Sequence, residues 1–406
     1  MTNYDETKVP QYELPCPLTC MDGTKCITPE QWFHVRRPEL LHLFSENIYG
    51  KKPDLGNPLR AEIIEEGLAL SKRALRRQIR LFFPQKTNTT ATHMDILCYM
   101  PNQIKSPVPL FLGLNFAGNH TIHADPSILL TSSWIDEKWE GVVDHRATEK
   151  SRGAQALRWD VDQIIERGYG LATIYYGDID PDFDDDYQNG VHPIFYRSDQ
   201  KRPNDDEWGS IGAWAWGLSR ALDYFHTDES IDNSRVAAFG HSRLGKAALW
   251  AGACDERFAL VISNESGCGG AALSRRCYGE TVKSINERFP HWFCNNFRKF
   301  NQNENNLPID QHQLIALIAP RPIYIASAFD DQWADPKGEF LAGLYADNVY
   351  RLTSNDGLPT KEFPPLEQAI MGRISYHIRR GRHGVMPYDW NQFLNFADFS
   401  IPPVNN

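Results

Sequence analysis

The chain has 406 residues, of which 41% are hydrophobic and 23% charged, so it can bury a large core and has the composition of a globular protein. Its formal net charge is -10, and basic residues gather only in short pairs such as Arg76-Arg77 and Arg379-Arg380, which argues against nucleic acid as a partner. No apolar run approaches the roughly 20 residues of a membrane span, so we expect no membrane association. The start, Met1–Glu6, shows no signal-peptide pattern.

Eight cysteines are few for this length. Cys16, Cys20 and Cys26 lie close together near the start, but no neighbouring His or Cys completes a zinc-type pattern. Free thiols or a disulfide are therefore expected there, with the pairing left open, and we expect no metal and no other cofactor.

The first part of the chain is interpreted as an irregular N-terminal wrap over residues 1–28, followed by a single domain over 29–406. A helix is predicted from Pro29 to Phe44, where apolar residues recur at helical spacing, namely Trp32, Val35, Leu40 and Leu41. Strands are predicted over 76–83 and 94–100. The apolar run 108–114 is typical of a strand that is buried on both faces in a parallel sheet.

The middle of the chain combines a surface insertion with further strand and helix signals. The insertion spans 126–153, and an amphipathic helix is predicted around Leu157, Val161, Ile164 and Ile165. A strand over 170–176 follows, and then the acidic loop 178–186. This loop does not match an EF-hand, because Phe183 stands where glycine is required, so we interpret it as a solvated loop.

A long helix over 211–225 leads into an apolar strand that meets Gly240-His241-Ser242-Arg243-Leu244-Gly245-Lys246. A Gly-flanked serine between a strand and a helix is the pattern of a nucleophile elbow, in which a sharp turn exposes the hydroxyl and the helix start offers N–H groups to an oxyanion. The second glycine comes one position later than G-x-S-x-G requires. From this segment alone, Ser242 as a simple N-cap of a helix over 244–253 stays open.

The alternation of strands and helices around the elbow predicts an α/β fold with a mostly parallel central sheet between two helical layers, as in α/β hydrolases. Many such enzymes place a second oxyanion donor after an earlier strand, which here corresponds to the loop 115–120. An ordinary loop is the alternative. Further on, the helix over 310–318 stops at Ala319-Pro320, and Asp335 with Pro336 predicts the start of another helix.

Serine catalysis needs a base, an acid that orients the base, and donors for the oxyanion. The order Ser, acid, His of α/β hydrolases is met by Ser242, Asp331 and His383. Glu265 and Asp331 each follow a predicted strand, with Asp330 a third candidate acid, and His383 lies in a Gly-flanked loop before the last helix. The sequence does not decide among the acids.

Three other histidines compete for the role of base. His241 adjoins the nucleophile, but its side chain is predicted to point away from it. His312 lies in a predicted helix and His377 in a strand-like run. Structural roles are predicted for all three.

With these residues located, the chain resembles a glucuronoyl esterase of the bacterial type, from carbohydrate esterase family 15. The resemblance runs from Arg36-Arg37-Pro38-Glu39 to Tyr388-Asp389-Trp390, and its most specific pieces are the elbow, Ser263-Asn264-Glu265-Ser266-Gly267, Ala319-Pro320-Arg321-Pro322 and Trp333-Ala334-Asp335-Pro336. The elbow of this family is G-x-S-R-x-G-K, which accounts for the displaced glycine.

The resemblance implies a role for each candidate residue. Ser242 is the nucleophile, His383 the base and Glu265 the usual acid, although some members place the acid where Asp331 stands; this chain holds both. Arg243 stabilises the oxyanion. The sugar ring is held by Lys246, Glu280 and Trp333. Many fungal members have a disulfide-bonded Cys in place of His241, and that bridge is absent here.

The implied activity is that of a 4-O-methyl-glucuronoyl methylesterase. It hydrolyses the ester between (4-O-methyl-)D-glucuronic acid of glucuronoxylan and lignin alcohols, through an acyl-enzyme. A broader carbohydrate acetyl or carboxyl esterase is the alternative, as is a non-catalytic carbohydrate-binding protein, against which the complete Ser, His, acid and Arg set argues. The resemblance implies a secreted or periplasmic enzyme, while the missing signal-peptide pattern leaves a cytoplasmic location open. We expect a monomer, and the sequence itself leaves the oligomeric state open.

Overall fold

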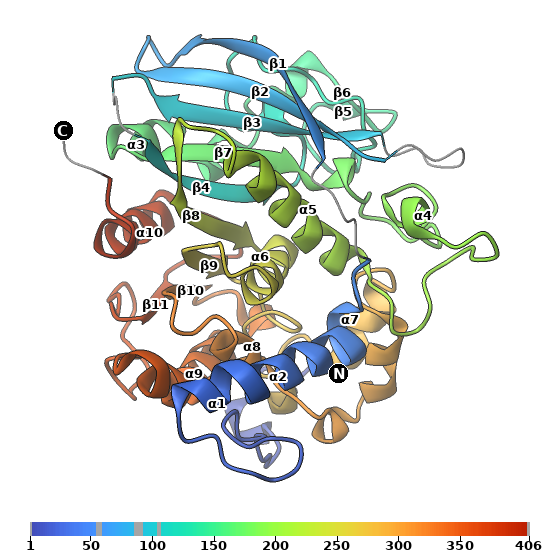
Figure 1. Ribbon diagram of the computed structural model, residues 1–406, viewed down its shortest axis with the longest axis vertical. Coiled ribbons are helices and arrows are strands. Elements are labelled where there is room, and N and C mark those ends of the chain that lie inside the picture. Colours follow the sequence, from blue (N-terminus) through green and yellow to red (C-terminus); the bar gives the residue numbers. More distant parts are fainter. Residues whose placement is uncertain (1, 54–58, 85–91, 104–106, 404–406) are drawn as a thin grey trace. The chain divides into compact units, whose positions relative to one another are not determined.

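The computed structural model describes residues 2–53, 59–84, 92–103 and 107–403 (Figure 1). The chain forms two compact units. The first unit comprises Met1–Lys52, Asn204–Gly212 and Gly240–Gly384, and the second comprises Pro53–Pro203, Ala213–Phe239 and Val385–Asn406. The single domain predicted over 29–406 stays a prediction.

Six strands of the large sheet lie in the described part of the second unit. In spatial order they are β1 (Arg60–Ala69), β2 (Ala74–Phe82), β3 (His93–Pro101), β7 (Gly170–Tyr175), β4 (Val108–Asn115) and β8 (Ile231–His241), whose last two residues belong to the first unit. The strands β1, β2, β3 and β7 pair antiparallel, whereas β4 pairs parallel with both β7 and β8. Every residue of β4 and β7 is buried, as predicted for parallel strands covered on both faces.

Strand β1 was not predicted from the sequence. Its register with β2 shifts between Ile63 and Glu65, which interrupts the two-residue alternation that marks a half-buried strand. It also lies at the edge of the sheet, and most of its residues are exposed or half-buried. An edge strand of this kind needs few apolar residues, so its sequence gives little signal.

The first unit contains three parallel strands, β9 (Leu260–Asn264), β10 (Ile323–Ala328) and β11 (Ile374–Arg379), in that spatial order. All their residues are buried. Helix α6 (Arg243–Cys254) approaches β9 closely, because a Cβ at Gly252 would lie 2.4 Å from Val261 Cγ2. Helix α9 (Pro336–Ser354) is joined to β11 by the Tyr376 hydroxyl, which donates to the Pro336 carbonyl at 2.9 Å.

The N-terminal helix over Pro29–Phe44 is confirmed, and Figure 1 shows it as one continuous helix. It comprises α1 (Pro29–Gln31), a wide π-turn at Trp32–Arg36, and α2 (Arg37–Phe44). Trp32 and Leu40 are buried, but the predicted core residue Val35 is 47% exposed. The wide turn shifts the buried face relative to an ideal helix, which the 3.6-residue period does not anticipate.

Two predictions in the second unit are wrong. Leu157 is 85% exposed in a short turn before α3 (Val161–Glu166), so it does not share the buried helix face. In the acidic loop, Asp178 and Asp180 are buried rather than solvated. The Asp178 carboxylate accepts the Ser133 hydroxyl at 2.6 Å, and burial raises its pKa to about 7.

The remaining helices are α4 (His192–Phe195), α5 (Ser210–Phe225), α7 (Val282–Arg288), α8 (Gln311–Ala316) and α10 (Pro387–Ser400). The insertion 126–153 carries a small hairpin, β5 (Val142–Val143) with β6 (Arg146–Ala147). The predicted cap of α9 is confirmed, because Asp335 accepts the Gly338 N–H at 2.9 Å. All eight cysteines are free thiols. No helix in the described part of the chain is long and apolar enough to cross a membrane.

Candidate active site

Ser242 lies at a sharp turn between β8 and α6. Its backbone has φ 58° and ψ −129°, a conformation that non-glycine residues rarely adopt. Its N–H donates to the Asn264 carbonyl at 2.8 Å, and its carbonyl accepts the Gly245 N–H at 2.9 Å. These bonds hold the strained turn in place, as a nucleophile elbow requires.

A side chain is excluded at each of the two elbow glycines, but by different neighbours. A Cβ at Gly240 would lie 2.0 Å from the Leu244 carbonyl oxygen, so the strand and the first turn of α6 meet only because that side chain is absent. A Cβ at Gly245 would lie 3.0 Å from Ser266 Cβ and 3.2 Å from the Gly240 carbonyl oxygen. The displaced second glycine therefore lets α6 approach the loop that follows β9.

A cavity of about 250 Å³ opens beside the elbow. All eight residues singled out from the sequence line it, namely Ser242, Arg243, Lys246, Glu265, Glu280, Asp331, Trp333 and His383. Its wall also includes residues that the sequence did not single out, namely Ser266, Gly267, Arg288, Phe289, Trp292 and Ala334. The structure thus brings together the whole predicted set, within the first unit.

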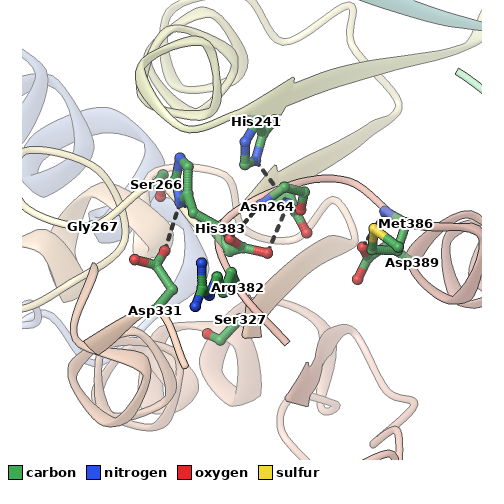
Figure 2. A network of polar contacts seen from close by, with 12 residues as sticks. His241, Asn264, Ser266, Gly267, Ser327, Asp331, Arg382, His383, Met386 and Asp389 are labelled. Carbon is green, nitrogen blue, oxygen red and sulfur yellow. Dashed lines mark hydrogen bonds and ion pairs between the residues drawn. The ribbon is translucent and has the colours of Figure 1, made fainter. Parts of the chain in front are cut away.

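The imidazole of His383 contacts both candidate acids. Its Nδ1 lies 2.6 Å from Asp331 Oδ2 and 3.1 Å from Glu265 Oε2 (Figure 2). Because ionised carboxylates only accept hydrogen bonds, Nδ1 carries the proton and Nε2 is left as the basic nitrogen. Burial lowers the pKa of His383, but the hydrogen bonds and charges of the two acids outweigh it and raise the pKa to about 9.

The two acids differ in how their charge is balanced. Glu265 Oε1 accepts the Arg379 guanidinium at 2.6 Å, and Oε2 accepts the Gly384 N–H at 3.0 Å. Burial raises the pKa of Glu265, against the effects of His383 and Arg379. In the part of the chain that the structure describes, His383 is the only ion-pair partner of Asp331.

Arg379 is a functional candidate that the sequence reasoning missed. Besides Glu265, its guanidinium donates to the carbonyls of Arg380, Arg382 and Gly384 at 3.0, 3.1 and 2.6 Å. It therefore fixes the loop that carries His383. Its position as the last residue of β11 was the available signal, but Arg379-Arg380 was interpreted only as a short basic pair.

The side chain of His241 packs against His383, and its predicted orientation away from Ser242 stays a prediction. Its ring centroid lies 4.4 Å from that of His383, and its Nδ1 is 2.9 Å from Asn264 Nδ2 (Figure 2). The amide donates this bond, which leaves His241 a packing partner of His383. His312 contacts the Pro15 carbonyl and His377 the Tyr324 hydroxyl, each at 2.9 Å, in agreement with structural roles.

Single donor atoms of His241, Glu265 and His383 lie within 4.8 Å of one another, close enough to be considered as metal ligands. Arg379 already neutralises the Glu265 carboxylate, however, and an added cation would compete with it. The donor set therefore fits an acid–base site better than a metal site.

Two of the cations that line the cavity, Arg243 and Lys246, come from α6. Arg243 is the first residue of α6, and its guanidinium carbon lies 4.9 Å from the Trp292 ring centroid. Lys246 Nζ donates to the carbonyls of Ser266 and Cys268 at 2.6 and 2.5 Å and lies 3.8 Å from Glu280 Oε2. Two of its three hydrogens are thus used within the protein, which leaves one toward Glu280 and a ligand.

The loops that carry Glu280 and Trp333 are tied to each other, because the Glu280 N–H donates to the Trp333 carbonyl at 2.9 Å. The N-terminal segment 3–6 ties them further. The Gly279 N–H donates to the Asn3 carbonyl at 2.8 Å, and the Tyr278 hydroxyl donates to the Tyr4 carbonyl at 3.1 Å. The start of the chain thus supports this wall of the cavity.

Comparison with known proteins identifies relatives over nearly the whole chain. A family model described as glucuronyl esterase, fungi, matches residues 164–353. A curated carbohydrate esterase, MZ0003, from an unknown prokaryotic organism is 52% identical over 397 residues, which cover 98% of this chain and 91% of that protein.

Two solved structures are similar throughout. A promiscuous CE15 esterase from a marine bacterial metagenome has 51% identity and a TM-score of 0.93, covering 99% of this chain and 100% of that one. A glucuronoyl esterase from Solibacter usitatus has 44% identity and a TM-score of 0.92, covering 97% of this chain and 100% of that one. The predicted α/β-hydrolase fold is confirmed.

Replacement of Gly240 by Ala is expected to destabilise the protein by about 3 kcal/mol, because the new Cβ meets the backbone of α6 rather than a movable side chain. Urea unfolding measures this change. Gly384→Ala is the matched control, since a Cβ there meets nothing within 4 Å. Equal midpoints for the two variants would contradict the steric explanation.

His383 is expected to titrate with a pKa of about 9, well above the ordinary histidine value. NMR titration of the imidazole signals measures it, with His383→Gln to assign the resonance. Asp331→Asn should move the midpoint downward, because the imidazolium then loses its closest carboxylate. A midpoint that stays in place in Asp331→Asn would show that this contact does not govern the imidazole.

Proposed function

Because the chain belongs to carbohydrate esterase family 15, we propose that it is a glucuronoyl esterase with Ser242 as its nucleophile. Its substrates are esters of (4-O-methyl-)D-glucuronic acid on glucuronoxylan, and lignin alcohols are the natural leaving groups. The observation that carries this proposal is the contact of His383 with two carboxylates in the cavity that Ser242 and Arg243 also line.

The reaction proceeds in two steps. The Ser242 hydroxyl attacks the C6 carbonyl of the uronosyl group while Nε2 of His383 takes its proton, and the same proton is then given to the leaving alcohol. Water repeats the attack on the acyl-enzyme. The N–H groups at the start of α6 and the guanidinium of Arg243 stabilise the oxyanion, whose charge develops only in the transition state.

We assign the role of working acid to Asp331. Its carboxylate is closer to His383 Nδ1 than that of Glu265, and it is free to stabilise the imidazolium that forms during the reaction. The Glu265 carboxylate is largely neutralised by Arg379 and holds the His383 loop through the Gly384 N–H. Glu265 is therefore the positioning residue of the pair.

Lys246, Glu280 and Trp333 form the sugar-binding wall. The remaining ammonium hydrogen of Lys246 and the oxygens of Glu280 can satisfy sugar hydroxyls, and the indole of Trp333 covers an apolar ring face. Burial lowers the pKa of Lys246, an effect that Glu280 counteracts, so the two side chains support each other's charged form.

A broader carbohydrate esterase is the second candidate, since a relative with 51% identity is described as promiscuous. It would use the same Ser242, His383 and Asp331 on acetyl or other carboxyl esters. For either activity we propose a secreted or periplasmic monomer.

The enzyme is expected to release alcohol from benzyl glucuronate with a higher kcat/KM than it shows for p-nitrophenyl acetate, because only the former fills the sugar-binding wall. Steady-state kinetics with both esters measure the ratio, and Ser242→Ala should lose activity on both. Faster relative turnover of the acetate would favour the broader esterase, and full activity of Ser242→Ala would refute the mechanism.

Asp331→Asn is expected to lower kcat/KM by about 1,000-fold and Glu265→Gln by only about 10-fold, since the first variant removes the partner of the imidazolium. Both are assayed on benzyl glucuronate, with urea unfolding to separate misfolding from lost catalysis. A larger loss in correctly folded Glu265→Gln would assign the role of working acid to Glu265 instead.

A further inference from the structure

One wall of the cavity is a row of two cations and three aromatic rings. The Arg288 guanidinium carbon lies 5.1 Å from the Trp333 ring centroid and 5.3 Å from that of Phe289. Phe289 and Trp292 stack with centroids 3.7 Å apart and planes 2° from parallel. Arg243 follows at 4.9 Å from Trp292. The row therefore runs from the proposed sugar platform to the residue next to the nucleophile.

Arg288 is placed in this row by the short helix α7. It is the last of the seven residues of this helix, whose N-cap Thr281 forms a capping box with Ser284. Glu280 directly precedes that cap, so one element supplies a cavity residue at each end. The capping box fixes the start of α7. The length of this helix, about 10 Å, then sets the separation between Glu280 and Arg288.

The guanidinium of Arg288 has its hydrogen-bond donors available. Arg288 is exposed at the cavity, and within residues 2–53, 59–84, 92–103 and 107–403 no hydrogen bond or ion pair engages it. Its two aromatic neighbours orient the planar group by cation–π contacts, without using its five N–H donors. A pre-oriented cation of this kind is suited to oxygen acceptors on a ligand.

We propose that Arg288 is a substrate-binding residue that donates hydrogen bonds to hydroxyl or ether oxygens of the uronosyl group resting on Trp333. This inference rests on the proposed glucuronoyl esterase function. It adds a donor to the sugar-binding wall beside Trp333. By lying over Trp333, the guanidinium also limits how much of the indole face a sugar can cover.

The position of Arg288 favours the acyl sugar over the alcohol as the group it contacts. Of its two ring neighbours, Phe289 also lies 5.8 Å from the Arg243 guanidinium carbon, whereas Trp333 is the proposed sugar platform. Its positive charge also helps to lower the pKa of Glu280, against the raising effect of burial, so the two groups are within electrostatic reach. Arg288 and Glu280 therefore influence each other electrostatically across the cavity that both line.

The experiment compares Arg288→Ala and Arg288→Lys with wild type on benzyl glucuronate, methyl glucuronate and p-nitrophenyl acetate. Arg288→Ala should raise KM about 10-fold for both glucuronates, with kcat within about twofold of wild type and no change on the acetate. Arg288→Lys should raise KM less, because it keeps the charge but loses the planar fork. Arg298→Ala removes another exposed arginine, outside the cavity, and should leave all three substrates unaffected.

Each other outcome overturns the inference in a recognisable way. An unchanged KM would show that Arg288 does not contact the substrate, and a KM effect confined to the benzyl ester would place it against the alcohol. Equal losses on the acetate would indicate a structural role. Failure of wild type to hydrolyse either glucuronate would refute the proposed function itself, and this inference with it.

Discussion

The site depends on one imidazole nitrogen that faces two carboxylates. Nδ1 of His383 lies within 3.1 Å of both Glu265 and Asp331, and two acids so close together would repel each other strongly if neither charge were balanced. Arg379 resolves this conflict by pairing with Glu265. The buried guanidinium of Arg379 thus allows two carboxylates to lie beside the loop of His383. Asp331, the carboxylate that Arg379 does not neutralise, is left to interact with the imidazole.

The same balance of buried charge extends across the cavity. Lys246 forms a long ion pair with Glu280 and donates hydrogen bonds to two backbone carbonyls. Arg243 makes a cation–π contact with Trp292. Each cation is held by groups that leave it directed at the cavity. Because charges that are partly buried in protein interact more strongly than in bulk water, this arrangement suits the oxyanion of the proposed mechanism.

The sequence predicted the parts of the structure that depend on local pattern. Apolar runs predicted the buried strands β4, β7 and β9–β11, and the glycine positions predicted the elbow. The order of Ser, acid and His, together with a family resemblance, predicted the set of cavity residues. The misses depend on tertiary context. Three features could be predicted only from neighbours that are distant in the sequence. They are the wide turn that exposes Val35, the burial of Asp178 beside Ser133 and the contact of His241 with His383. Arg379 was missed because the sequence does not show whether an arginine is buried. Only the structure shows that Arg379 is paired with the carboxylate of Glu265.

The attachment of Asn3 and Tyr4 to Gly279 and Tyr278, directly before Glu280, has a practical consequence for engineering. These residues are remote from the nucleophile in the chain, yet they support the segment that carries Glu280 on the cavity wall. Substitutions at Asn3 and Tyr4 are therefore a way to reshape this wall of the cavity from a distance, without altering the residues that line it.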